Sequence, residues 1–75
     1  MGISTRVWSH SERTYAERPE SFLWDGRLFE VETIEKAWQE PGEKHFRART
    51  KGDKLFELCY HELWDEWTAI ELIQL

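Results

Sequence analysis

The stretch that decides the fold is FLWDGRLFEV, residues 22–31. Apolar residues recur on both sides of the pair Asp25-Gly26. Asp-Gly tolerates positive φ at both centres of a type I′ turn, whose twist matches that of two antiparallel strands. The pairing outward from this turn is then Trp24 with Arg27, Leu23 with Leu28 and Phe22 with Phe29. One face of the hairpin is apolar (Phe22, Trp24, Phe29 and Val31) and needs a core, so we predict a small β domain.

Length and composition limit the size of that domain. A chain of 75 residues is one domain, near the lower size limit for folding without a staple or a partner. Aromatic residues make up 15 % of it and include five Trp, so a core of about a dozen side chains is expected.

The single cysteine and the lack of long apolar runs predict the compartment. Cys59 alone excludes an intramolecular disulfide framework and fits a reducing environment. The sequence has no apolar run long enough to span a membrane and no signal-peptide core. We therefore expect a cytoplasmic protein.

The strand that follows the first turn changes its apolar parity. Phe29 and Val31 are odd-numbered, whereas Ile34 and Trp38 are even-numbered. A strand with a period of two needs a bulge or bend near Thr33 to do this, and such bends curl small sheets into barrels. A short helical turn over residues 32–38 is the alternative.

A second hairpin is predicted from residues 45–50 and 54–61. A two-residue turn would mix the apolar and solvent faces, whereas a three-residue loop over 51–53 keeps them apart. The loop pairs Ala48 with Phe56, Phe46 with Leu58 and Arg47 with Glu57. The same register places His45 opposite Cys59 and predicts an outward salt bridge between Arg47 and Glu57.

The last segment, residues 54–75, is ambiguous by periodicity. As a strand after a turn at 64–67, it places Thr68, Ile70 and Leu72 on one face. As a helix capped by Asp53, it forms one apolar stripe. The members of that stripe are Phe56, Cys59, Tyr60, Leu63, Trp67 and Ile70.

The order Arg18-Pro19, Phe22, Gly26-Arg27, Val31, Ile34 and Trp38 resembles a family of short bacterial proteins of unknown function, often labelled simply as cytoplasmic proteins. The resemblance covers roughly residues 17–73, and it implies a small antiparallel β architecture for residues 54–75. Members of the family often have Gly or Asp-Pro in the last turn, where this chain has residues 61–66, HELWDE. The resemblance implies no catalytic residues.

These observations together predict one small antiparallel β domain over residues 19–75. We expect four to five strands curled toward an SH3-like barrel, preceded by a loosely ordered arm over residues 1–18. The arm adds an edge strand from Ile3 to Trp8. An α+β fold with a C-terminal helix over residues 54–75 is the alternative.

Charge is distributed unevenly along the chain. Residues 44–54 hold five basic residues and one acidic residue, a net charge of +4, which leaves −9 for the rest of a chain whose total is −5. An acidic protein disfavours non-specific binding to nucleic acid or anionic membranes. The basic hairpin nevertheless offers a local contact for nucleic acid through Arg47, Arg49, Lys51 and Lys54.

Aromatic residues near turns suggest a different function. Trp24, Trp38, Trp64 and Trp67 lie at predicted turns or strand ends. Tryptophan and arginine are enriched at interface hot spots, so Trp24 stacked on Arg27 would suit a protein partner or a homodimer. We therefore expect a non-catalytic interaction or binding module, with the nucleic-acid contact as the alternative.

The soft metal ligands of the chain are His10, His45, Cys59 and His61. Three of them converge on one strand face in the predicted register, with Glu57 nearby. No close pair such as Cys-x-x-Cys is present, so we expect no metal and no cofactor. Cys59 as a nucleophile would need a lowered pKa and a cleft, for which so short a chain has little room, so no enzyme activity is expected.

Overall fold

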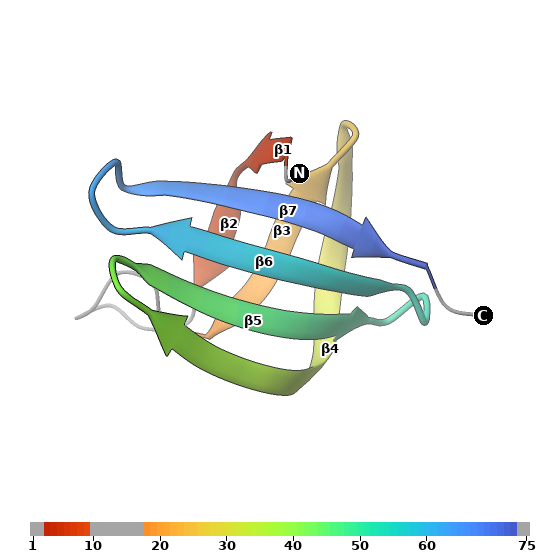
Figure 1. The fold of residues 1–75 in the computed structure, drawn as a ribbon. Helices are drawn as coiled ribbons and strands as arrows, with labels where there is room; N and C mark the ends of the chain where they lie inside the picture. Colours follow the sequence, from red (N-terminus) through yellow and green to blue (C-terminus); the bar gives the residue numbers. More distant parts are fainter. Residues whose placement is uncertain (1–2, 10–17, 74–75) are drawn as a thin grey trace.

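The computed structural model describes residues 3–9 and 18–73, which form strands and turns and contain no helix. Seven strands form one antiparallel sheet (Figure 1). They are β1 (Ile3–Thr5), β2 (Val7–Ser9), β3 (Pro19–Trp24), β4 (Arg27–Glu40), β5 (Glu43–Thr50), β6 (Leu55–His61) and β7 (Glu66–Leu72).

The N-terminal segment brings the two edges of the sheet together. In the strand order β1-β7-β6-β5-β4-β3-β2, the two edge strands are consecutive in sequence and separated only by Arg6. The Leu23 amide donates to the Arg6 carbonyl at 3.0 Å, and the Thr5 hydroxyl donates to the Leu23 carbonyl. The sheet is therefore nearly closed into a barrel, and in Figure 1 β2 and β3 cross behind β5 and β6.

The bend of β4 makes this curvature possible. Its first part pairs with β3 and its remainder with β5, and the register to β5 shifts between Val31 and Thr33 and again between Ile34 and Lys36. The irregularity predicted near Thr33 is thus confirmed. The alternative of a helical turn over residues 32–38 is wrong, because they lie within strand β4 and pair with β5 except at Glu32 and Glu35, where the register shifts.

The two predicted turns are confirmed. Asp25 and Gly26 have φ of 52° and 75°, as a type I′ turn requires, and the three predicted pairs of β3 with β4 are present. Residues 51–53 form the three-residue loop, in which Asp53 takes the left-handed conformation at φ 64°. All predicted pairs of β5 with β6 follow, including His45 with Cys59.

The alternative of a C-terminal helix is wrong, because residues 55–61 and 66–72 are strands β6 and β7. Phe56, Leu58 and Tyr60 are buried, and the residues between them are half-buried, which is the period of a strand. In β7, Thr68, Ile70 and Leu72 share the outer face as predicted, and Ala69 faces the core.

The predicted count of four to five strands is wrong, since the sheet has seven. The predicted edge strand from Ile3 to Trp8 consists of two strands that pair with opposite edges, which a local pattern does not reveal. Residues 1–2 and 10–17 of the predicted arm lie outside the described residues.

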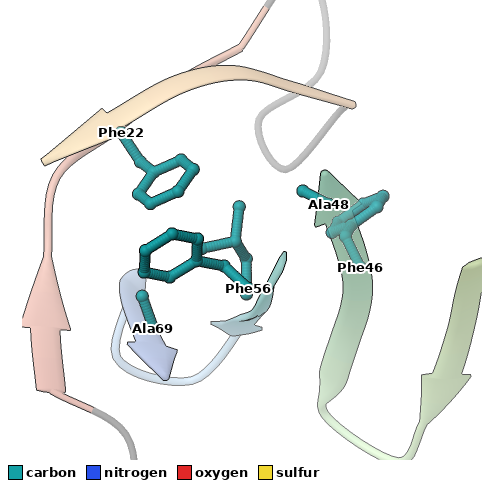
Figure 2. Close-up of a cluster of buried hydrophobic side chains, with 6 residues drawn as sticks. Phe22, Phe46, Ala48, Phe56 and Ala69 are labelled. Carbon is teal, nitrogen blue, oxygen red and sulfur yellow. The ribbon is translucent and has the colours of Figure 1, made fainter. Parts of the chain in front are cut away.

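The core is a cluster of rings around Phe56 of β6 (Figure 2). Its ring centroid lies 4.9 Å from that of Phe22, 5.4 Å from that of Trp24 and 5.1 Å from that of Phe29. Phe46, Ala48, Leu58 and Ala69 complete the cluster. The inner faces of the first hairpin and of β5–β7 therefore share one interior.

We expect Phe56→Ala to lower the free energy of unfolding by about 3–5 kcal/mol, because it removes the ring at the centre of the core. Leu28→Ala is the matched control, since Leu28 is exposed on the first hairpin, and should change stability by about 0.5 kcal/mol or less. Urea unfolding followed by Trp fluorescence measures both. Equal effects of the two substitutions would contradict this assignment of the core.

Candidate functional site

Four chemically reactive side chains lie together on the outer face of β5 and β6. Alternation along each strand turns Glu43 and His45 of β5 outward, and does the same for Cys59 and His61 of β6. The register places Glu43 opposite His61 and His45 opposite Cys59. We call these four residues the outer cluster.

The side chains of the outer cluster contact one another. Glu43 lies between the two rings: one carboxylate oxygen is 2.9 Å from His45 Nε2, and the other is 3.5 Å from His61 Nδ1. Cys59 Sγ is 3.8 Å from His45 Nε2. A second carboxylate, that of Glu40 at the end of β4, lies 3.8 Å from His45 Nε2.

Neighbouring side chains hold both imidazole rings in place. Trp38 of β4 stacks on His45 with centroids 5.0 Å apart and an interplanar angle of 6°. Only 12 % of the His45 side chain is exposed, and its Nδ1 is buried without a partner in the described part of the chain. His61 Nε2 is 3.2 Å from the Thr68 hydroxyl of β7.

The environment of Cys59 disfavours its thiolate. Burial, followed by the negative charges of Glu43, Glu57 and Glu40, raises the pKa of the thiol from its ordinary value of 9.0 to about 11. The thiol is therefore protonated at neutral pH, which makes it a poor nucleophile. This supports the expectation that Cys59 is not catalytic, and the absence of enzyme activity stays a prediction.

Three cations of the predicted basic hairpin are paired with carboxylates. Arg49 lies 2.6 Å from Glu35 and 2.8 Å from Asp53, and these hydrogen bonds raise its pKa. Lys51 lies 3.2 Å from Glu30, and Lys54 lies 3.5 Å from Glu71. The hairpin is thus less available to phosphates than its sequence indicates.

Arg47 has the predicted position opposite Glu57, but among the described residues the two form no ion pair. Arg47 Nε is buried and has no hydrogen-bond partner among the residues that the structure describes.

At the first turn, Trp24 packs against Phe56, and the Arg27 guanidinium lies 5.7 Å from the Phe29 ring centroid. The structure thus places Arg27 over Phe29, where the sequence suggested Trp24.

The turn between β6 and β7 carries the most exposed pair of neighbouring apolar side chains in the described residues. Leu63 is 84 % exposed and Trp64 is 70 % exposed. The Trp64 ring centroid is 6.2 Å from that of His61, so this turn borders the outer cluster. The Glu62 amide donates to the Gly42 carbonyl at 2.9 Å, which joins the turn to the β4–β5 turn on the left of Figure 1.

Two surface grooves are present, one away from the outer cluster and one beside His45. The larger, of about 750 Å³, runs beside β3 and the first part of β4, and contains no residue of the outer cluster. The smaller, of about 280 Å³, is lined by Arg18, Trp38, Lys44 and Phe46 together with His45. Neither groove brings together a nucleophile and a base.

Sequence reasoning found three members of the outer cluster and missed Glu43 and its neighbour Glu40. Pro41-Gly42 predicts a loop over residues 39–43, whereas in the structure Glu40 ends β4 and Glu43 begins β5. The signal that could have found Glu43 is the pair of motifs Glu43-x-His45 and Cys59-x-His61, since each spacing places both residues on one strand face. His10 lies outside the described residues.

No family model, curated protein or solved structure matches the chain. The resemblance to short bacterial proteins therefore stays a prediction. Within residues 3–9 and 18–73, no helix of sufficient length and apolar character to cross a membrane is present. The function is argued below from the geometry alone.

We expect Cys59 to react with iodoacetamide at pH 8 about a hundredfold more slowly than an ordinary thiol, because its pKa is raised to about 11. The folded state holds this proton more tightly than the unfolded state, so the associated stability is complete below about pH 9 and is lost as the pH rises toward about 11. Alkylation is followed by mass spectrometry in the presence of a chelator. Glu43→Gln should increase the alkylation rate of Cys59. A rate for Cys59 in the unsubstituted chain equal to that of free cysteine would refute the expectation.

Proposed function

We propose that this protein is a non-catalytic interaction module that binds a basic, apolar-containing peptide segment of a partner protein through its β6–β7 turn. The observation that carries the proposal is the exposure of Leu63 and Trp64, two large neighbouring side chains that lie outside the core cluster of residues 3–9 and 18–73. Tryptophan is enriched among the anchors that dominate binding interfaces, and Leu63 adds apolar surface beside it.

Charges around these anchors support the basic character of the partner. Glu62, Asp65 and Glu66 flank Leu63 and Trp64 in the sequence. Glu40 and Glu43 flank the adjoining β4–β5 turn, which a backbone hydrogen bond holds against Glu62. A segment that supplies Lys or Arg beside an apolar side chain complements both properties of this surface.

The turn is held in one conformation, which lowers the entropic cost of binding. The Tyr60 hydroxyl, from a buried side chain, donates to the Asp65 carboxylate at 2.6 Å. Asp65 itself takes the left-handed conformation at φ 50°. These contacts together with the Glu62–Gly42 hydrogen bond present Leu63 and Trp64 on a fixed support.

The alternative of nucleic-acid contacts through the basic hairpin gains less support. Arg49, Lys51 and Lys54 already pair with carboxylates, so binding phosphate would break these contacts. A homodimer in which this acidic turn meets the basic hairpin of a second copy is disfavoured for the same reason.

We also infer that the nearly closed sheet is of the SH3-like class, and that the protein belongs to the bacterial cytoplasm. The bent strand β4, which pairs with β3 and then with β5, supports the former. The single cysteine and the resemblance described above support the latter.

Selection from a library of short random peptides tests the proposed interaction. We expect the protein to enrich peptides that combine Lys or Arg with Leu, Phe or Trp. The double substitution Leu63→Ser with Trp64→Ser should weaken binding of the selected peptides at least tenfold, because it removes both anchors. Ile73→Ser, which removes an exposed apolar side chain outside the turn, is the control and should leave binding unchanged.

Several outcomes would overturn the proposal. They are the absence of enriched peptides, equal binding by the double variant, and enrichment of acidic peptides. Self-association detected by sedimentation would assign the same surface to a second copy, and binding of single-stranded RNA would favour the alternative.

The salt dependence of peptide binding is a separate test of the acidic surroundings. Glu62→Lys combined with Glu66→Lys should weaken binding at low salt by about tenfold and make it less sensitive to added salt, because exposed charges are screened. Fluorescence anisotropy of a labelled selected peptide measures both effects. An unchanged salt dependence would show that only the apolar anchors contribute.

A further inference from the structure

The geometry points to a zinc site on the outer face of β5 and β6, formed by Glu43, His45, Cys59 and His61. This inference does not rest on the proposed function, because it does not use the anchors Leu63 and Trp64, although the two share the carboxylate of Glu43. It concerns a metal ligand set that the sequence alone did not favour.

The chemistry of the four donors selects the metal. A thiolate, two imidazoles and a carboxylate are the ligands that Zn²⁺ takes in proteins, with a preference for four ligands in a tetrahedron. Magnesium and calcium prefer sites made of oxygen atoms, which this one is not. Zinc is therefore the metal that fits the donor set.

The donor atoms are already close to the required separations. Two ligand atoms of a tetrahedral zinc ion lie about 3.3–3.6 Å apart, given metal–ligand distances of about 2.0–2.3 Å. His61 Nδ1 lies 3.5 Å from Glu43 Oε2, whereas His45 Nε2 lies 2.9 Å from the other oxygen, Oε1, and 3.8 Å from Cys59 Sγ. Ligand atoms of Glu43, Cys59 and His61 all lie within 4.8 Å of one another. Glu43, Cys59 and His61 therefore form the close-set part of the site, and His45, which contacts Glu43 and Cys59, must turn toward them to act as the fourth ligand.

The partner of His61 outside the site orients this ligand. Its Nε2 is 3.2 Å from the Thr68 hydroxyl, which can accept a hydrogen bond from Nε2 when Nδ1, on the Glu43 side of the ring, binds the metal. A hydrogen bond from the second ring nitrogen is the usual support of a metal-bound histidine.

The second histidine is held mainly by packing. Stacking on Trp38 fixes the plane of the His45 ring, whose Nε2 lies near Glu43, Glu40 and Cys59. The site is thus shaped by β4 and β7 as well as by the two strands that carry the ligands.

The negative surroundings that disfavour a free thiolate favour a divalent cation. Without metal, the Cys59 thiol keeps its proton beside the carboxylates of Glu43, Glu40 and Glu57. When zinc binds, the S–H bond breaks, a Zn–S bond forms and the proton leaves to solvent. The positive charge of the ion then offsets both the thiolate and the nearby carboxylates.

The register explains why the sequence pattern does not announce this site. Zinc ligands often come in close Cys or His pairs along one segment. Here each strand supplies two donors at spacing i, i+2, and only the pairing of β5 with β6 brings the two pairs together.

Titration of the full chain with Zn²⁺ and with Co²⁺ tests the site. We expect one ion per chain by calorimetry and a thiolate-to-cobalt charge-transfer band in the near ultraviolet. Cys59→Ser should abolish the band, and His61→Gln, which removes a ligand, should weaken zinc binding by more than the roughly 10–100-fold typical for loss of a group that only supports a ligand. Thr68→Val should weaken it to a smaller extent, since this residue only positions His61.

The carboxylates provide a matched control that does not depend on removing the cysteine. Glu43→Gln should weaken zinc binding at least tenfold, because it removes a ligand, whereas Glu57→Gln removes an equal charge from the same face but no ligand and should weaken it several times less. Absence of heat and of the cobalt band with the unmodified chain would overturn the proposal. Equal weakening by the two Glu→Gln variants would also overturn it, since it would indicate only general attraction of cations. Peptide binding by a chain that binds no zinc would leave the proposed function intact.

Discussion

The pairing of β5 with β6 is the constraint on which both faces of the sheet depend. The three-residue loop over 51–53, with Asp53 in the left-handed conformation, fixes this register. On the inner face it packs Ala48 beside Phe56, and on the outer face it places His45 beside Cys59. A slip of one residue would exchange the faces of one strand, so the core and the outer cluster would be lost together.

Closure of the sheet determines which surface is available for function. The bend of β4 and the split N-terminal segment curl the sheet so that its inner face encloses the core. Among the described residues no further layer covers the outer face of β5–β7. Polar side chains there are half-buried by their neighbours on the same face, a setting that shifts the pKa of Cys59 and limits the motion of His45. A small barrel thus acquires a structured site on its outside.

The sequence predicted the features that depend on neighbouring residues and missed those that depend on distant ones. Asp25-Gly26, the parity change near Thr33 and the odd loop are local signals, and all three were confirmed. The periodicity of residues 54–75 did not separate a strand from a helix. One of the contacts that supports the final strand, the pairing of β7 with β1, joins the two ends of the chain and leaves no local signal. Three members of the outer cluster followed from the register, but Glu43 was hidden by the apparent loop around Pro41.

The two proposals share carboxylates, so the ligands they describe are coupled. Glu43 would coordinate zinc, and it also contributes to the negative charge that attracts a basic peptide. His61 would coordinate the same ion, and its ring lies 6.2 Å from that of Trp64. An ion of charge +2 at the outer cluster therefore reduces the electrostatic attraction for the peptide while leaving the apolar anchors in place. Thermodynamic linkage requires the reverse effect to be equal, so a basic peptide on the turn must weaken zinc binding by the same factor.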